Sequence, residues 1–349
     1  MTAKILKVAV VGGGFIHGVY HMPSYRNMAE VNVIAACAAT KEEVELFADR
    51  WGIRRRYYGE DGIERLCADP DVDLVDVGLP NFLHLRAIRA AAENHKHVIC
   101  EKPLAKNVQE AEEMVALTRR YGVIDCYAEN QVFIPQVVRA KEFISNGALG
   151  RPFWVRAREA HFGPHSKWFW EPELAGGGVL MDMGCHSIEV GRYLIGRKPV
   201  SVCAWASTFV HKTRAEENSV VMVNHEESEL TQAENSWAAH GGFDLRIEIY
   251  GSEGAIYIDA TKGTGVQMFT VASEEKVGAI VEKSETKKGW MFPTWDEVVT
   301  YGFQSELRHF VSSILQGESP RETFEDGLMI NKVVDAAYRS MKSKRWESV

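Results

Sequence analysis

Residues 8–18 read VAVVGGGFIHG and decide the fold. Four apolar residues run into three glycines, and a helical pattern follows. Glycines at such a turn let the backbone approach a pyrophosphate group, which then lies on the N-terminus of the next helix. This order of strand, glycine-rich turn and helix predicts a dinucleotide-binding domain, and a glycine-rich turn without a ligand is the alternative interpretation.

The turn departs from the G-x-G-x-x-G fingerprint at its third glycine, where His17 stands and Gly18 comes one residue late. An acidic residue at the end of the second strand would bind the ribose 2′-hydroxyl of NAD. That strand ends instead in Cys37-Ala38-Ala39-Thr40-Lys41. Thr40 could contact the ribose or cap a helix, and Lys41 could meet a 2′-phosphate or lie solvated. The cofactor is therefore NAD or NADP, with the choice open.

The first third of the chain alternates short apolar runs with helical patterns. The runs carry apolar residues on both faces, as is typical of a parallel sheet covered on both sides: Val8–Val11, Val31–Cys37, Leu74–Val77 and Val98–Cys100. Two of the helices have start and stop signals: Thr40 with Glu43 and Gly52, and Asn107 with Glu110 and Gly122. The pattern predicts a doubly wound Rossmann sheet.

After Tyr127 the pattern changes to that of an α+β domain with a large, mostly antiparallel open sheet. A helix is expected over Pro135–Ser145 and a half-exposed strand over Pro152–Glu159. An antiparallel meander is expected over five further runs: Val200–Val210, Ser219–His225, Leu230–Trp237, Phe243–Tyr250 and Ala255–Asp259. The closing helices are expected over Trp295–Leu315 and Glu325–Ser343.

These patterns predict two domains for the 349 residues. Residues 1–128 would form the dinucleotide-binding domain, and residues 129–349 a domain for substrate binding and oligomerisation. The closing helices are the segment that could pack back on the first domain.

Composition excludes several classes of protein. Hydrophobic residues make up 46% and charged residues 25%, as in an ordinary globular protein, and the net charge of −8 disfavours nucleic acid as a partner. The six cysteines form no C-x-x-C pair, which argues against a zinc module and a disulfide scaffold. No apolar run approaches the ~20 residues of a membrane span. We expect a cytoplasmic protein without membrane contact.

A second motif, Cys100-Glu101-Lys102-Pro103, ends the fourth of the apolar runs. The carboxyl edge of an open α/β sheet is where ligands bind, and proline restricts where the residue before it points. Beside a positively charged nicotinamide ring, Lys102 would have a lowered pKa and could exchange a proton with a substrate oxygen. An exposed lysine paired with Glu101 is the alternative.

A third motif places three glycines, 176–178, before a helical pattern that carries Asp182 and His186. Four-residue spacing puts the carboxylate and the imidazole on one helix face, where the carboxylate would raise the pKa of a general base. A buried Asp–His pair with a structural role is the alternative. Glu189, His161 and His165 could add metal ligands, but no tight ligand motif joins them, so we expect no metal.

In chain order, these motifs resemble those of one family. They are the glycine-rich turn, Leu79-Pro80-Asn81 with His84, Glu101-Lys102-Pro103, and the three glycines with Asp182 and His186. The chain is similar over nearly its whole length to the glucose–fructose oxidoreductase, inositol dehydrogenase and rhizopine catabolism (Gfo/Idh/MocA) family. The resemblance implies a Rossmann domain, a C-terminal α/β domain with an open sheet, and a homodimer or homotetramer formed through that sheet.

The resemblance also implies residue roles. Lys102 and His186 would be the catalytic pair, and Asp182 would hold a substrate hydroxyl and tune the histidine. The pyrophosphate would be lined by Gly12, Gly14, Phe15 and Ile16, and the nicotinamide riboside by Pro80, Asn81, His84 and Glu101. The chain departs from the family pattern at His17, at Ala38 in place of an acid, and at Ser187-Ile188-Glu189 after the histidine.

Aromatic and imidazole side chains complete the predicted substrate site. His161, His165 and Trp168 are expected to face the pocket, and Trp168 could stack on the apolar face of a pyranose. Phe169 is expected to pack against the sheet. A second aromatic group, Trp290 with Phe292 and Trp295, could be a rim for an aglycone or core.

The predicted activity is hydride transfer between a nicotinamide cofactor and a secondary alcohol of a sugar, glycoside or cyclitol. His186 would take the hydroxyl proton and Lys102 would stabilise the developing oxyanion. An NAD-dependent glycosidase that oxidises C3 transiently is one alternative, although such members usually depart from Glu-Lys-Pro. A non-catalytic dinucleotide sensor is another, but it predicts degraded catalytic positions, and Lys102, Asp182 and His186 are intact.

Overall fold

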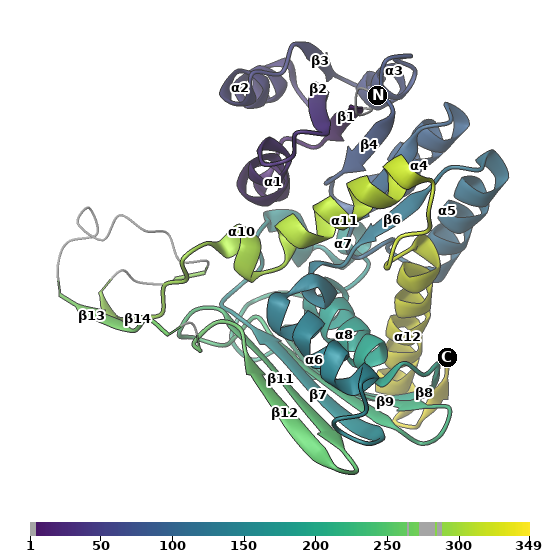
Figure 1. Ribbon diagram of the computed structural model, residues 1–349. Helices are drawn as coiled ribbons and strands as arrows, with labels where there is room; N and C mark the ends of the chain where they lie inside the picture. Colours follow the sequence, from purple (N-terminus) through teal and green to yellow (C-terminus); the bar gives the residue numbers. More distant parts are fainter. Residues whose placement is uncertain (1–4, 264, 272–282, 285–287) are drawn as a thin grey trace. The chain divides into compact units, whose positions relative to one another are not determined.

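The computed structural model describes residues 5–263, 265–271, 283–284 and 288–349 (Figure 1). The chain forms two compact units, the first made of residues 1–130 with 303–331 and the second of residues 131–302 with 332–349. The first of these boundaries lies near the predicted division at residue 128. Segment 303–331, one of the closing stretches, belongs to the first unit.

The first unit is built on a six-stranded parallel sheet with the strand order β3-β2-β1-β4-β5-β6. This is the order of a Rossmann fold, as predicted. The strands are β1 Leu6–Val11, β2 Val31–Ala38, β3 Arg55–Tyr58, β4 Leu74–Val77, β5 His97–Glu101 and β6 Asp125–Ala128. The predicted apolar runs correspond to β1, β2, β4 and β5, whose inner residues are buried.

Helices cover this sheet, and their ends follow the predicted signals. They are η1 His17–His21, α1 Met22–Arg26, α2 Lys41–Trp51, α3 Gly62–Cys67, η2 Asn81–Leu83, α4 His84–Glu93, α5 Val108–Tyr121 and α11 Phe303–Gln316. Thr40 and Glu43 form a capping box at the start of α2, and the Asn107 side chain accepts the Glu110 N–H at the start of α5. Both capping predictions are confirmed.

The second unit is built on a seven-stranded mixed sheet with the order β12-β11-β7-β10-β9-β8-β15. The strands are β7 Pro152–Ala160, β8 Pro199–Ser207, β9 Asn218–His225, β10 Leu230–Ser236, β11 Asp244–Gly251, β12 Gly254–Asp259 and β15 Glu347–Ser348. The expected meander is wrong at one point: β7 lies between β10 and β11 and runs parallel to β10. A pairing between strands that far apart in sequence leaves no local pattern.

Helices α6 and α8 cover one face of this sheet (Figure 1). The helices of the unit are α6 Pro135–Ser145, η4 Lys167–Trp170, α7 Pro172–Ala175, η5 Leu180–Gly184, α8 Cys185–Ile195 and α10 Glu297–Thr300. Two helices span a boundary between the units: η3 Asn130–Phe133 and α12 Phe324–Ser343, both of which start in the first unit and end in the second. The short strands β13 Met268–Thr270 and β14 Gly289–Met291 pair with each other.

The predicted helix over Trp295–Leu315 is two helices, because the chain turns between α10 and α11 at Gly302, where φ is 87°. Within the described residues, each helix is too short or too polar to cross a lipid bilayer.

Candidate active site

The carboxyl ends of β1, β4 and β5 lie side by side at one edge of the Rossmann sheet. The glycine turn follows β1, Gly78–Asn81 follows β4, and Lys102 follows β5. The Gly78 N–H donates to the Val11 carbonyl at 3.0 Å, which ties the first two loops together. The carboxyl end of β2 lies at the same edge, because β2 pairs in parallel with β1. The sheet therefore gathers the predicted cofactor-binding residues of the first unit along one edge.

Gly12 can only be glycine. Its φ is 105°, and a Cβ there would collide with the Gly78 carbonyl. Gly14 and Phe15 are exposed, a Cβ at Gly14 would meet nothing within 4 Å, and helical residues begin at Phe15. An exposed backbone turn at a helix N-terminus fits a pyrophosphate group, so the residues present suit a dinucleotide.

His17 occupies the place of the third glycine because Gly78 makes room for it. A Cβ on Gly78 would lie 2.8 Å from the His17 ring, which is fully buried. The His17 Nδ1 bonds to the Gly12 carbonyl, and Nε2 lies 3.4 Å from Asp76 Oδ1. The departure from the fingerprint is therefore compensated within the same edge of the sheet, and the ring braces the turn.

Behind the edge lies a buried network that the sequence analysis missed. The His21 imidazole joins two carboxylates, with Nδ1 2.8 Å from Asp76 Oδ2 and Nε2 3.0 Å from Glu101 Oε1. The Tyr25 hydroxyl donates to the same Asp76 oxygen at 2.8 Å. Burial alone would lower the His21 pKa, but the two carboxylates outweigh it and hold that pKa well above its usual value. The imidazolium in turn keeps the pKa of Asp76 far below normal.

Ligand atoms of His17, His21 and Asp76 lie within 4.8 Å of one another, a spacing that a metal ion could use. Both ring nitrogens of His21 face carboxylates, as in an imidazolium that donates twice, whereas a metal ligand needs a nitrogen lone pair. We therefore describe the group as a hydrogen-bond network, and the expectation of no metal stays a prediction.

Glu306 of α11 adds a further carboxyl group near the network of His21, Asp76 and Glu101. Its side chain is buried, and neither oxygen has a hydrogen-bond partner within the described residues. Burial, and then the negative charge of Glu101, raises the pKa of Glu306 well above its usual value.

Glu101 connects the network to Lys102. Its Oε2 accepts the Lys102 backbone N–H at 3.1 Å, and the Lys102–Pro103 peptide is cis. The Lys102 side chain is half-buried.

His84 is fully buried and ties the loops after β4 and β5 together. Its Nε2 lies 2.9 Å from the Leu79 carbonyl, and its Nδ1 lies 3.1 Å from the Leu104 carbonyl. Burial lowers the pKa of His84.

At the end of β2, both residues considered for the ribose have partners within α2. The Thr40 hydroxyl accepts the Glu43 N–H at 3.2 Å, and the exposed Lys41 ammonium lies 3.6 Å from Glu45. Thr40 therefore caps α2, and Lys41 lies exposed on the first turn of that helix, which are the alternatives to cofactor binding given above.

In the second unit, the glycine triplet lets the chain pass close to the half-buried carboxyl group of Glu216. A Cβ on Gly178 would collide with the Glu216 backbone, and one on Gly177 would collide with the Tyr338 hydroxyl. Glu216 Oε1 accepts the N–H groups of Gly178 and Leu180, at 2.9 and 3.2 Å, and the Tyr338 hydroxyl at 2.7 Å. These contacts fix the start of the helical segment that carries Asp182.

Asp182 and His186 lie four residues apart on that segment and are both buried. Asp182 belongs to the π-helical turn η5, a feature often found at functional sites, and His186 lies in the first turn of α8. The Trp237 indole N–H donates to Asp182 Oδ2 at 3.2 Å. Glu189 is bound by Arg192 through two hydrogen bonds of 2.7 Å, which use both of its oxygens.

The other predicted substrate residues form two groups. The rings of His161 and His165 lie 5.0 Å apart, edge to face. Trp168 stacks on Phe169 at 3.8 Å, and Phe169 packs edge to face on Trp237, as expected for a core residue. The Gly163 N–H donates to the Trp237 carbonyl at 2.8 Å, which joins the histidine segment to the tryptophan that holds Asp182.

Comparison with known proteins agrees with both units. Residues 6–129 match the family described as "Oxidoreductase family, NAD-binding Rossmann fold", and residues 137–257 match the "GFO/IDH/MocA C-terminal domain". Trans-1,2-dihydrobenzene-1,2-diol dehydrogenase of Xenopus laevis is 30% identical over 88% of this chain and 89% of its own. The chain belongs to the Gfo/Idh/MocA oxidoreductase family.

Two further relatives support this. Myo-inositol 2-dehydrogenase of Thermotoga maritima is 27% identical over 97% of each chain. The crystal structure of GenD2 from gentamicin A biosynthesis, in complex with NAD, is 29% identical with a TM-score of 0.92 and covers 100% of this chain and 97% of its own. The first unit is therefore the NAD-binding Rossmann domain of a Gfo/Idh/MocA oxidoreductase.

Two signals could have pointed to the buried network. Asp76 interrupts the apolar run of β4, and an acid within a buried strand needs partners. His17 and His21 stand four residues apart in the first helical segment, so they lie on one side of it. Glu306 gave no comparable signal, because its contacts span more than 200 positions of sequence.

Proposed function

We propose that this Gfo/Idh/MocA oxidoreductase oxidises a secondary alcohol of a sugar, glycoside or cyclitol. The observation that carries the proposal is the pair Asp182 and His186, buried on a segment fixed by Glu216, with Asp182 held by an indole N–H. An oriented carboxylate beside an imidazole is what a general base near neutral pH needs. Three of the relatives' names, those of inositol, levoglucosan and apiose dehydrogenases, support this substrate class.

Each residue then has a role in the reaction. His186 accepts the hydroxyl proton, and Asp182 orients the imidazole and holds a substrate hydroxyl. Lys102 stabilises the negative charge that develops on the substrate oxygen. When bound, the nicotinamide ring supplies the hydride acceptor. His161, His165 and Trp168 bind the remainder of the substrate.

The cofactor is held by the edge of the Rossmann sheet. Gly12, Gly14, Phe15 and Ile16 bind the pyrophosphate, while Pro80, Asn81 and Glu101 line the nicotinamide riboside. His84 is buried with both ring nitrogens directed at backbone carbonyls, so it positions the surrounding loops. We propose NAD as the cofactor, on the strength of the GenD2 structure, with little discrimination against NADP because β2 ends without an acid.

The first experiment is near-ultraviolet absorbance of reduced nicotinamide. Purified protein is mixed with NAD⁺ or NADP⁺ and a panel of inositols, hexoses and aryl glycosides. Sustained reduction with one pairing supports the proposal and names cofactor and substrate class together. Release of the aglycone without net reduction would point to the glycosidase alternative. No change in absorbance with any substrate, although the cofactor binds, would support the non-catalytic sensor.

The role of Lys102 is tested by replacing it. We expect Lys102→Ala to lower kcat about a thousandfold, because a preformed cation at a developing oxyanion is lost. NADH affinity, measured by fluorescence titration, should change little. Lys106→Ala is the control, since Lys106 is equally half-buried and pairs with Glu110 at 3.4 Å. Near-normal turnover of the Lys102 variant would refute the assignment.

A further inference from the structure

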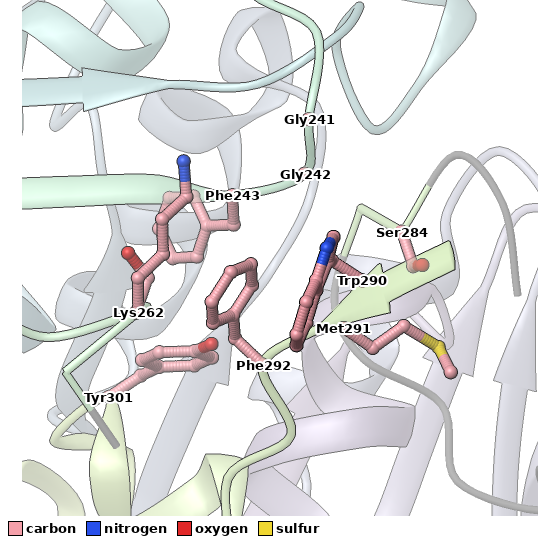
Figure 2. Close-up of a pocket in the computed structure, with 10 residues that line it drawn as sticks. Gly241, Gly242, Phe243, Lys262, Ser284, Trp290, Met291, Phe292 and Tyr301 are labelled. Carbon is pink, nitrogen blue, oxygen red and sulfur yellow. The ribbon is translucent and has the colours of Figure 1, made fainter. Parts of the chain in front are cut away.

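A pocket in the second unit has four aromatic side chains among the ten residues that line it (Figure 2). Its empty space, counted out to the open mouth, is about 550 Å³. Phe243, Trp290, Phe292 and Tyr301 supply rings, and Lys262 lies beside Phe243. None of these residues is needed by the reaction proposed above.

The rings are arranged as a site and not as core. Phe243 and Tyr301 pack edge to face at 5.3 Å, and Tyr301 is buried, so they form a fixed base. Trp290, by contrast, is 64% exposed although it lies in β14 beside the pocket. Figure 2 shows the indole facing the side of the pocket that Phe292 occupies. A large exposed ring at a concave apolar surface marks a place where a ligand binds.

The backbone leaves this space open. Gly241 and Gly242 have φ of 101° and 85°, a conformation that side chains with a Cβ rarely adopt. Among the described residues, a Cβ on Gly242 would meet only the Lys283 carbonyl, at 3.9 Å. This wall of the pocket therefore consists of backbone without side chains.

The pocket adjoins the histidines proposed for the substrate. The Phe243 ring lies 6.0 Å from the ring of His161, which is paired with His165. An imidazole and an aromatic ring, those of His161 and Tyr301, thus both pack against Phe243. A ligand that spans both would be polar and hydroxylated at one end and flat and apolar at the other.

We propose that the pocket binds the aglycone of a glycoside, as a flat aromatic ring stacked between Trp290 and Phe292. The inference rests on the proposed oxidation of a carbohydrate and narrows its substrate to aryl glycosides, with the sugar ring toward His161. Aromatic rings stack favourably beyond the area they bury, and Trp290 and Phe292 both line the pocket.

The test compares methyl and phenyl glycosides of one sugar, for glucose, galactose and mannose in both anomers. In the wild-type enzyme, kcat/KM for the phenyl glycoside should exceed that for the methyl glycoside at least tenfold. Trp290→Ala and Phe292→Ala should bring this ratio close to one. Trp295→Ala is the matched control, because Trp295 is 81% exposed and does not line the pocket, so the ratio should be kept.

Calorimetric titration separates this inference from the function on which it rests. The same phenyl glycosides should bind wild-type protein more tightly than the methyl glycosides, and Trp290→Ala should abolish the difference, whether or not nicotinamide is reduced. Oxidation of methyl glycosides without any phenyl preference would overturn the aglycone site and leave the dehydrogenase. A phenyl preference in binding without oxidation of any substrate would overturn the dehydrogenase and leave the site.

Discussion

His21 is the residue on which the electrostatics of the Rossmann edge depend. Its fully buried ring bridges Asp76 and Glu101, and Glu101 binds the Lys102 N–H. If His21 is removed, two buried carboxylates remain without their counter-charge. Breaking a buried ion pair from one side costs about 3–5 kcal/mol. His21 is therefore a positioning residue for the loop that carries Lys102.

We predict that His21→Asn lowers the free energy of unfolding by about 3 kcal/mol at pH 6 and by less at higher pH. The pKa of His21 is raised in the folded state, so the folded protein binds its proton more tightly than the unfolded chain. That stabilisation is complete below the ordinary histidine pKa of about 6.5 and is lost as the pH rises through the folded-state pKa.

Urea unfolding of both proteins at several pH values measures this difference. His95→Asn is the control, because His95 is exposed and has a φ of 55°, which asparagine tolerates. A difference between wild type and His21→Asn that stays constant or grows from pH 6 to 9 would contradict an imidazolium at this position.

At the scale of elements, the glycine triplet before η5 gives a matched pair of substitutions. At Gly178 an added Cβ meets the Glu216 backbone, which cannot move aside, whereas at Gly177 it meets the end of the Tyr338 side chain. We expect Gly178→Ala to cost about 2 kcal/mol or more, in the range of overpacked cores. It should also lower kcat, because η5 carries Asp182.

Thermal unfolding and turnover of both variants test this. Gly177→Ala should be the milder change in both measurements, since the Tyr338 side chain can shift by giving up its hydrogen bond to Glu216, whereas the Glu216 backbone is held in place. Equal effects of the two alanines would mean that contact with the Glu216 backbone does not fix the start of η5.

The end of β2 carries the cofactor prediction. Ala38 stands where an acid often selects NAD, and Thr40 and Lys41 are occupied by Glu43 and Glu45. Ala38→Asp should raise the ratio of kcat/KM for NAD⁺ over NADP⁺ at least tenfold, because the carboxylate accepts the ribose 2′-hydroxyl and repels a 2′-phosphate. Asn32→Asp, which adds the same charge at the exposed start of β2, should leave the ratio unchanged.

Elements defined by contacts between residues close in sequence could be predicted, and those defined by contacts between distant positions could not. Strands with continuous apolar runs, such as β1, and helices with local caps, such as α2, were predictable within a few residues. The short edge strand β3, with the sequence RRYY and alternating burial, lacked such a run. The insertion of β7 beside β10 and the partners of Asp76 depend on contacts between distant positions, for which a single sequence has no periodic signal.

At the scale of the molecule, the described residues of the second unit leave one face of the seven-stranded sheet uncovered. α6 and α8 cover the other face, while Trp205 and Val220, paired across β8 and β9, are both exposed. Ion pairs lie in the neighbouring strands, such as Arg158 with Asp244 at 3.2 Å. An exposed sheet surface that mixes aromatic side chains with arginine is typical of a protein interface.

We therefore predict that the protein is a homodimer or homotetramer assembled through this face, as the family resemblance implies. Trp205→Lys with Val220→Glu should reduce the molar mass measured by light scattering to that of one chain, since buried charges without partners oppose association. Leu46→Lys is the control, because Leu46 is 72% exposed on α2, in the other unit. A wild-type protein that scatters as a monomer, or a double variant of unchanged mass, would exclude this face as the interface.

Turnover of the double variant shows whether assembly is needed for activity. If the mass falls and turnover is kept, the site is complete within one chain. If both fall together, the assembly is needed for activity.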